Sequence, residues 1–167
     1  MIQIIDNFLP ENEHKEYFEH YHSLNQLWRF SQKTNSNASE TGNAYFMYET
    51  YEHKWRDKDG NKLEPASDVT NLLKYLPNGY NFILRSKANL FIKQDKPVQY
   101  GMHYDFPQLD SYKILLYYIN TNNGGTEFEN GKFIESVANR AAIVDGDIKH
   151  QTIGQTDADV RIIININ

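Results

Sequence analysis

The sequence of 167 residues contains no cysteine. Disulfide bonds, thiolate metal sites and cysteine nucleophiles are therefore excluded. Any bound metal would have to use imidazole nitrogen atoms, carboxylates or carbonyl oxygen atoms as ligands. A protein without cysteine needs no oxidising compartment, and we expect a cytoplasmic location.

The chain also lacks a long apolar segment and an excess of basic residues. No apolar run approaches the roughly 20 residues that span a membrane, and the opening MIQIIDNF does not have the pattern of a secretion signal. The formal net charge is −5, whereas nucleic-acid-binding proteins usually carry a basic surface. We therefore expect neither a membrane nor a nucleic acid as a partner.

What the chain does contain is ordinary for a globular protein, apart from its aromatic content. Hydrophobic residues make up 40% and charged residues 23% of the sequence. Aromatic residues reach 14%, with 12 tyrosines, and tyrosine suits half-buried strands and the walls of ligand clefts. The length fits one domain with a sizeable core, and we expect a single domain over residues 1–167.

Two helices and two strands are predicted in the N-terminal half. Pro10 suits the first turn of a helix, and acidic residues just after it favour a helix over 11–23. The side chains of this helix expected to face a core are Tyr17, Phe18 and Tyr21. Valine and leucine at helical spacing predict a second helix over 66–76. The predicted strands are 2–5 and 44–49, with a polar loop over 32–43.

The pattern changes after residue 80 to short strands separated by turns rich in asparagine, aspartate and glycine. The predicted strands are 81–93, 98–104, 112–120, 125–128, 131–135, 141–145, 149–153 and 160–166. Short strands punctuated in this way are typical of an antiparallel sandwich or barrel. We therefore expect a mainly β (α+β) fold, with an N-terminal helical layer over about 1–80 and a β-barrel core over about 81–167.

His103 and Asp105 form the most informative pair in the sequence. Residues two apart on a strand point to the same face, so both side chains could reach one metal ion. An H-x-D pair alone is weak, because it arises often by chance. His150, on a later predicted strand, could complete a set of two histidines and one carboxylate. Such a set leaves adjacent coordination positions open and is typical of non-haem Fe(II) oxygenases.

Arg161 begins the strongly apolar final segment of the chain. A charged side chain entering an apolar strand needs a partner, and the guanidinium matches a carboxylate in two-point geometry. The partner could be a bound carboxylic acid. A structural ion pair with Asp147 or Asp159 is the alternative.

The order of these residues resembles that of the 2-oxoglutarate/Fe(II) oxygenase superfamily, and more closely its prolyl-4-hydroxylase-like branch. The segments that carry this resemblance, besides the H-x-D pair, are Ile-Asp-Asn-Phe-Leu-Pro at 5–10, Tyr-Tyr-Ile-Asn at 117–120, Gly-Gly-Thr-Glu-Phe at 124–128 and the run from 139 to His150. The resemblance covers most of residues 81–167, and residues 24–66 add little to it.

The resemblance implies a double-stranded β-helix, that is, a jelly-roll barrel. It implies that His103, Asp105 and His150 bind Fe(II), and that Arg161 and Tyr118 bind 2-oxoglutarate, with O₂ as the second co-substrate and ascorbate as an accessory reductant. Phe91 departs from the pattern, since some relatives carry there a tyrosine that also touches the co-substrate. The implied reaction hydroxylates an aliphatic C–H bond while 2-oxoglutarate is converted to succinate and CO₂.

Several alternatives remain open at this stage. The chain could be a β-barrel binding module with a degenerate site, or a different metalloenzyme of similar fold, such as an isomerase or a zinc-dependent hydrolase. Within the oxygenase reading, the substrate could be a prolyl residue of a peptide or protein, another amino acid or a small metabolite. Tyr100 and Tyr104 could line a substrate cleft or pack in strands, Tyr118 could be a core residue, and Met102 is expected in the core.

Overall fold

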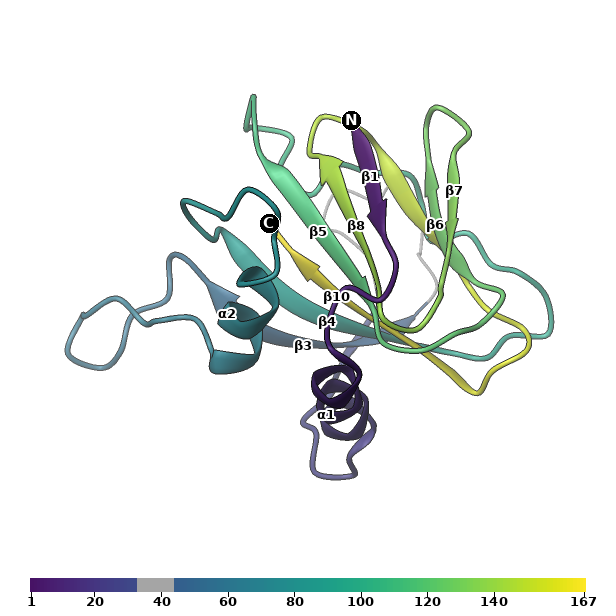
Figure 1. Ribbon diagram of the computed structural model, residues 1–167, viewed down its shortest axis with the longest axis horizontal. Coiled ribbons are helices and arrows are strands. Elements are labelled where there is room, and N and C mark those ends of the chain that lie inside the picture. Colours follow the sequence, from purple (N-terminus) through teal and green to yellow (C-terminus); the bar gives the residue numbers. More distant parts are fainter. Residues whose placement is uncertain (33–43) are drawn as a thin grey trace.

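The computed structural model describes residues 1–32 and 44–167. Nearly all of the predicted loop over 32–43 lies outside the described residues. The described chain folds into two antiparallel sheets, one large and one small (Figure 1). The large sheet has the strand order β1-β8-β5-β10-β4-β3-β2, and the small one has the order β7-β6-β9. This arrangement confirms the expected jelly-roll fold.

The strands and helices have the following bounds. The strands are β1 (Ile2–Ile5), β2 (Arg29–Ser31), β3 (Tyr45–Glu52), β4 (Arg85–Ile92), β5 (Lys113–Tyr118), β6 (Gly125–Phe128), β7 (Phe133–Glu135), β8 (Arg140–Asp145), β9 (His150–Ile153) and β10 (Val160–Ile166). The helices are α1 (Glu11–His22) and α2 (Ser67–Leu73). Neither helix in the described part of the chain is long and apolar enough to cross a membrane.

The expected division into a helical layer and a separate barrel is wrong. β1, β2 and β3 all precede residue 80, yet they belong to the large sheet. β1 extends one edge by pairing with β8, and β3 pairs with β4 along most of its length. The N-terminal half therefore builds part of the barrel wall as well as the helices that cover it.

The strand predicted over 98–104 is also wrong. This segment is joined to β9 only by isolated bridges, at Gln99 with Ile153 and at His103 with His150. Gly101 lies between the two bridges with a φ of +87°. A left-handed residue cannot continue a regular strand, so the ladder is interrupted there.

Helices α1 and α2 pack on the outer face of the large sheet. Their buried side chains, Tyr17, Tyr21, Val69, Leu72 and Leu73, form one core cluster with the sheet. Phe18 was expected in this core, but it is 41% exposed. The helix turns by 100° per residue, so Phe18 lies about 100° around the helix from Tyr17, at the edge of the buried face.

The inner face of the large sheet meets the small sheet in a second core cluster. Strand periodicity assigns the residues of β10 to the two faces. Ile162, Ile164 and Ile166 join the helix-side cluster, whereas Ile163 joins the cluster between the sheets. Arg161 and Asn165 are in phase with Ile163 and therefore face the interior of the barrel.

Candidate metal and co-substrate site

His103, Asp105 and His150 come together in the barrel interior. One potential ligand atom from each residue lies within 4.8 Å of the others, and Nε2 of His150 is 3.7 Å from Oδ2 of Asp105. Among the described residues, this is the only group of three or more potential metal ligands that lie so close together. Two imidazoles and one carboxylate on one side leave the opposite coordination positions free.

Backbone pairing places the two histidines opposite each other. The amide of His103 donates to the carbonyl of His150 at 2.9 Å, and the amide of His150 donates back at 3.0 Å. The two rings lie 4.9 Å apart. The pairing of His103 with the first residue of β9 thus replaces the regular strand expected from the H-x-D spacing.

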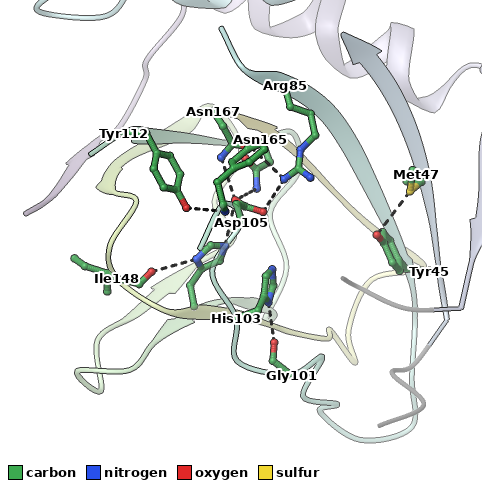
Figure 2. A network of polar contacts seen from close by, with 12 residues as sticks. Tyr45, Met47, Arg85, Gly101, His103, Asp105, Tyr112, Ile148, Asn165 and Asn167 are labelled. Carbon is green, nitrogen blue, oxygen red and sulfur yellow. Dashed lines mark hydrogen bonds and ion pairs between the residues drawn. The ribbon is translucent and has the colours of Figure 1, made fainter. Parts of the chain in front are cut away.

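The hydrogen bonds of both imidazoles favour metal binding. Nδ1 of His103 lies 2.9 Å from the carbonyl of Gly101, and Nδ1 of His150 lies 3.4 Å from the carbonyl of Ile148 (Figure 2). A carbonyl can only accept, so each Nδ1 must carry the proton. Each Nε2 then has a free lone pair, which is the tautomer that a metal-binding histidine needs.

Three side chains hold the carboxylate of Asp105. Arg85 donates to Oδ1 at 2.8 Å, while Asn165 and Asn167 donate to Oδ2 at 3.1 and 3.0 Å (Figure 2). The Asp105 side chain is only 2% exposed. These donors fix the orientation of the carboxylate, as outer partners of a metal ligand usually do.

The electrostatics keep Asp105 and His103 in the forms that bind a metal. Burial alone would raise the pKa of Asp105, but the charges of Lys87, His150 and Arg85 hold this pKa well below its usual value. Burial, reinforced by His150, lowers the pKa of His103. At neutral pH the site therefore offers an ionised carboxylate and a neutral His103.

Arg161 lies on the same interior face, with its side chain fully buried. None of its three guanidinium nitrogen atoms has a hydrogen-bond partner among the described residues. The guanidinium carbon lies 5.2 Å from the centre of the Phe91 ring and 5.7 Å from that of Tyr118. Burial lowers the pKa of Arg161 to about 10, so the group is still charged at neutral pH. Within the described chain, no ion pair to Asp147 or Asp159 satisfies it.

Gly124 explains part of the Gly-Gly segment noted in the sequence. A Cβ atom at this position would lie 2.8 Å from the carbonyl oxygen of Ile153 and 3.1 Å from Cδ of Arg161. The first of these distances is too short for a real contact. A side chain here would push apart the backbone of β9 and the stem of Arg161, so glycine makes room for the buried arginine.

Tyr118 is fully buried beside Arg161, and its hydroxyl donates to Oγ1 of Thr126 at 2.9 Å. Burial raises the pKa of Tyr118, so the hydroxyl stays protonated. Thr126 also lines the cavity that contains the two histidines. A ligand bound at Arg161 would therefore lie near the hydroxyl groups of Tyr118 and Thr126. Phe91 forms part of the wall of this cavity.

The cavity between the histidines and this inner region has a volume of about 30 Å³. That is room for about two water molecules, so a larger ligand requires lining side chains to move. Sequence reasoning missed two of the lining residues, Lys87 and Asn89, and it also missed the residues that hold Asp105. The available signal was a polar residue at every second position of β4 and at the end of β10, which marks a polar stripe on an inward face.

The three residues next to the H-x-D pair, Tyr100, Met102 and Tyr104, differ in how deeply they are buried. Tyr100 is 1% exposed and packs edge-on against Phe91, with ring centres 4.8 Å apart, so it is a core residue. Met102 was expected in the core, but it is 39% exposed. Tyr104 is half-buried, and Nζ of Lys149 lies 5.3 Å from its ring centre. The turn of the backbone at Gly101 sends Met102 outward.

Comparisons with known proteins find similarity in structure but not in sequence. No family model matches the chain, and no curated protein matches it. An oxidoreductase of the 2OG-Fe(II) oxygenase family from Burkholderia pseudomallei has a TM-score of 0.66 at 10% identity, with 99% of this chain and 83% of that chain covered.

Two further solved structures are similar over the same span. A prolyl hydroxylase from Trichoplax adhaerens, in complex with a hypoxia inducible factor peptide fragment, has a TM-score of 0.64 at 16% identity, covering 99% of this chain and 81% of that chain. The non-haem α-ketoglutarate-dependent epimerase SnoN has a TM-score of 0.63 at 12% identity, with coverage of 99% and 76%. The chain thus has the jelly-roll fold seen in 2-oxoglutarate/Fe(II) oxygenases, prolyl hydroxylases among them.

Proposed function

We propose that this protein is an Fe(II)- and 2-oxoglutarate-dependent dioxygenase. His103, Asp105 and His150 would hold the metal, and Arg161 would hold the far carboxylate of 2-oxoglutarate, with Tyr118 beside it. One observation carries the proposal: a charged guanidinium is buried, without a partner among the described residues, in the same barrel interior as the three potential ligands. An unpaired buried charge is costly, and a bound carboxylate would satisfy it.

The donor set fits iron rather than a purely structural metal. Two imidazoles and a carboxylate match the facial arrangement of non-haem Fe(II) oxygenases, which keeps positions open for a chelating co-substrate and dioxygen. Bound iron would supply the dioxygen chemistry, in which decarboxylation of 2-oxoglutarate to succinate and CO₂ accompanies hydroxylation of an aliphatic C–H bond.

The residues of the chain would orient the reactants and exclude water. Arg85, Asn165 and Asn167 keep the carboxylate of Asp105 aimed at the metal position. The guanidinium of Arg161 can bind a carboxylate through two parallel hydrogen bonds. The rings of Phe91 and Tyr118 flank this guanidinium and make its surroundings apolar, which strengthens the electrostatic interaction.

A prolyl residue in a peptide or protein is the substrate we favour. Its support is the sequence resemblance together with the structural similarity to a prolyl hydroxylase solved with a peptide. The same chemistry on another amino acid or a small metabolite is the alternative, and the similarity to an epimerase keeps it open. Ascorbate has no support from the site or the comparisons.

A turnover assay tests the reaction class. Purified protein with Fe(II), 2-oxoglutarate and O₂ should form succinate, and His103→Ala should abolish this activity. A peptide library analysed by mass spectrometry should then reveal the product that gains one oxygen atom. Absence of both 2-oxoglutarate binding and iron-dependent turnover would favour a degenerate binding module instead.

A further inference from the structure

Lys87 is a second buried cation in the candidate site, which the sequence pattern does not point to. Its charge helps to keep Asp105 ionised, but the proposed reaction gives it no contact with a ligand. It lies on β4 and is 7% exposed. Its side chain lines the same cavity as His103 and His150. Lysine is almost never buried without a partner, so its position calls for a ligand or a structural reason.

The described residues give Lys87 no hydrogen bond and no ion pair. The nearby acidic groups are Asp105 and Glu49, whose charges act on it without direct contact. The carboxylate of Asp105 is already held by Arg85 and two amides. Other side chains therefore make the hydrogen bonds that hold Asp105, and Lys87 is not needed for that purpose.

The strand register places Lys87 and Arg161 at different depths of the barrel. Lys87 pairs with Asn165, which donates to Asp105, so it lies at the level of the metal ligands. Arg161 pairs with Phe91, four residues farther along β4. At 3.3 Å per residue, the two Cα levels are about 13 Å apart. Both side chains are long enough for the two charged groups to lie closer together than the two Cα atoms.

The interior therefore presents one cation near the metal ligands and another deeper in the barrel. A linear dianion with a carboxylate at each end matches this arrangement, and 2-oxoglutarate is such a molecule. We propose that the ammonium of Lys87 binds the 1-carboxylate of 2-oxoglutarate beside the metal, while Arg161 binds its 5-carboxylate. This inference rests on the proposed function and adds a binding residue to it.

The flexibility of lysine suits this role. The cavity of about 30 Å³ is too small for 2-oxoglutarate as it stands. A lysine stem has four rotatable methylene groups and carries a compact charge that can follow a ligand. If the Lys87 side chain swings to the side of the cavity, it leaves room for the ligand. Its ammonium group can then lie beside the entering carboxylate.

The test compares the binding of three ligands to the Fe(II)-loaded protein without oxygen, measured by calorimetry. The ligands are 2-oxoglutarate, 2-oxopentanoate, which lacks the 5-carboxylate, and 4-oxopentanoate, which lacks the 1-carboxylate. Lys87→Met should weaken the binding of the first two by about 10- to 100-fold, the range of a charged hydrogen bond. Its affinity for 4-oxopentanoate should stay unchanged.

Two other variants serve as controls. Arg161→Met should weaken 2-oxoglutarate and 4-oxopentanoate but not 2-oxopentanoate. Lys93→Met, which removes an exposed lysine just beyond β4, should change none of the three affinities. If Lys87→Met binds 2-oxoglutarate as tightly as the unaltered protein, or loses all three ligands equally, the inference is overturned.

The outcomes also separate this inference from the proposed function. Failure of the unaltered protein to bind 2-oxoglutarate would overturn both. Dependence on Arg161 but not on Lys87 would leave the function standing and remove only the role of Lys87. A structural role of Lys87 predicts instead that Lys87→Met and Lys87→Gln both lower the unfolding temperature of the ligand-free protein. Our inference predicts an equal or higher temperature for Lys87→Met, because it removes a buried charge.

Discussion

Replacing Arg161 by methionine should stabilise the ligand-free protein while destroying its response to 2-oxoglutarate. The guanidinium is fully buried, and its three nitrogen atoms have no hydrogen-bond partner in the part of the chain that the structure describes. Each unsatisfied buried group costs about 1–3 kcal/mol. The cation–π contacts with the two flanking rings stabilise the charge by about 1–2 kcal/mol each. Taken at the middle of these ranges, the net cost of the arginine is about 3 kcal/mol, and methionine fills the space without a charge.

Thermal unfolding with and without the co-substrate checks this reasoning. A gain of about 3 kcal/mol corresponds to about 6–12 °C for a chain of this size. The unaltered protein, loaded with metal, should gain about 2.7 kcal/mol when 2-oxoglutarate reaches 100 times its Kd, whereas Arg161→Met should gain almost nothing. The difference between the unfolding temperatures of the variant and the unaltered protein should therefore shrink or change sign when ligand is added. A less stable ligand-free variant would refute the argument, because it would show that the chain itself satisfies the guanidinium.

Three further predictions concern the metal ligands and the core. Asn165→Leu should weaken Fe(II) binding about 10- to 100-fold, because it removes a donor that orients Asp105; a metal titration giving an unchanged Kd would contradict this. The pKa of His103 is lowered in the folded state, so the unfolded chain takes up this proton first, and stability should fall as the pH drops below about 6.5. His103→Asn should flatten that loss in urea unfolding at pH 7 and pH 5, and an equally steep loss would contradict it. Phe18→Ser should cost less than about 0.5 kcal/mol and Leu72→Ala about 2–5 kcal/mol, and equal losses in urea unfolding would contradict the assignment of the buried helix face.

The sequence predicted elements best where the local pattern and the tertiary environment agree. β10 lies at the centre of the large sheet, and its isoleucines predict it to the residue. The predicted strand over 98–104 failed because Gly101 adopts a left-handed conformation that composition cannot reveal. β2 was missed because its three residues have no periodicity of their own, and their conformation depends on pairing with β3.

The three potential metal ligands could be predicted as a set, although the geometric reason was incomplete. His103 and Asp105 were expected on one face of a strand, but a backbone pair with His150 brings His103 into the site. The partners of Asp105 come from β4 and from the end of the chain, at least 20 residues away in sequence. Such contacts depend on strand register, which sequence spacing alone cannot fix.

If the proposed function holds, the charges of the barrel interior favour a doubly charged co-substrate over a simple 2-oxo acid. Arg85 forms an ion pair with Asp105, whereas Lys87 acts on this carboxylate only from a distance. Arg161 has no ion pair among the described residues, so the interior carries more positive than negative charge. A divalent metal increases this positive charge further. A monoanion such as pyruvate would leave the deeper cation unpaired at full desolvation cost, whereas 2-oxoglutarate pairs both. Selectivity for a dicarboxylate then follows from the alternation of β4 and β10, which places both cations on the inward face.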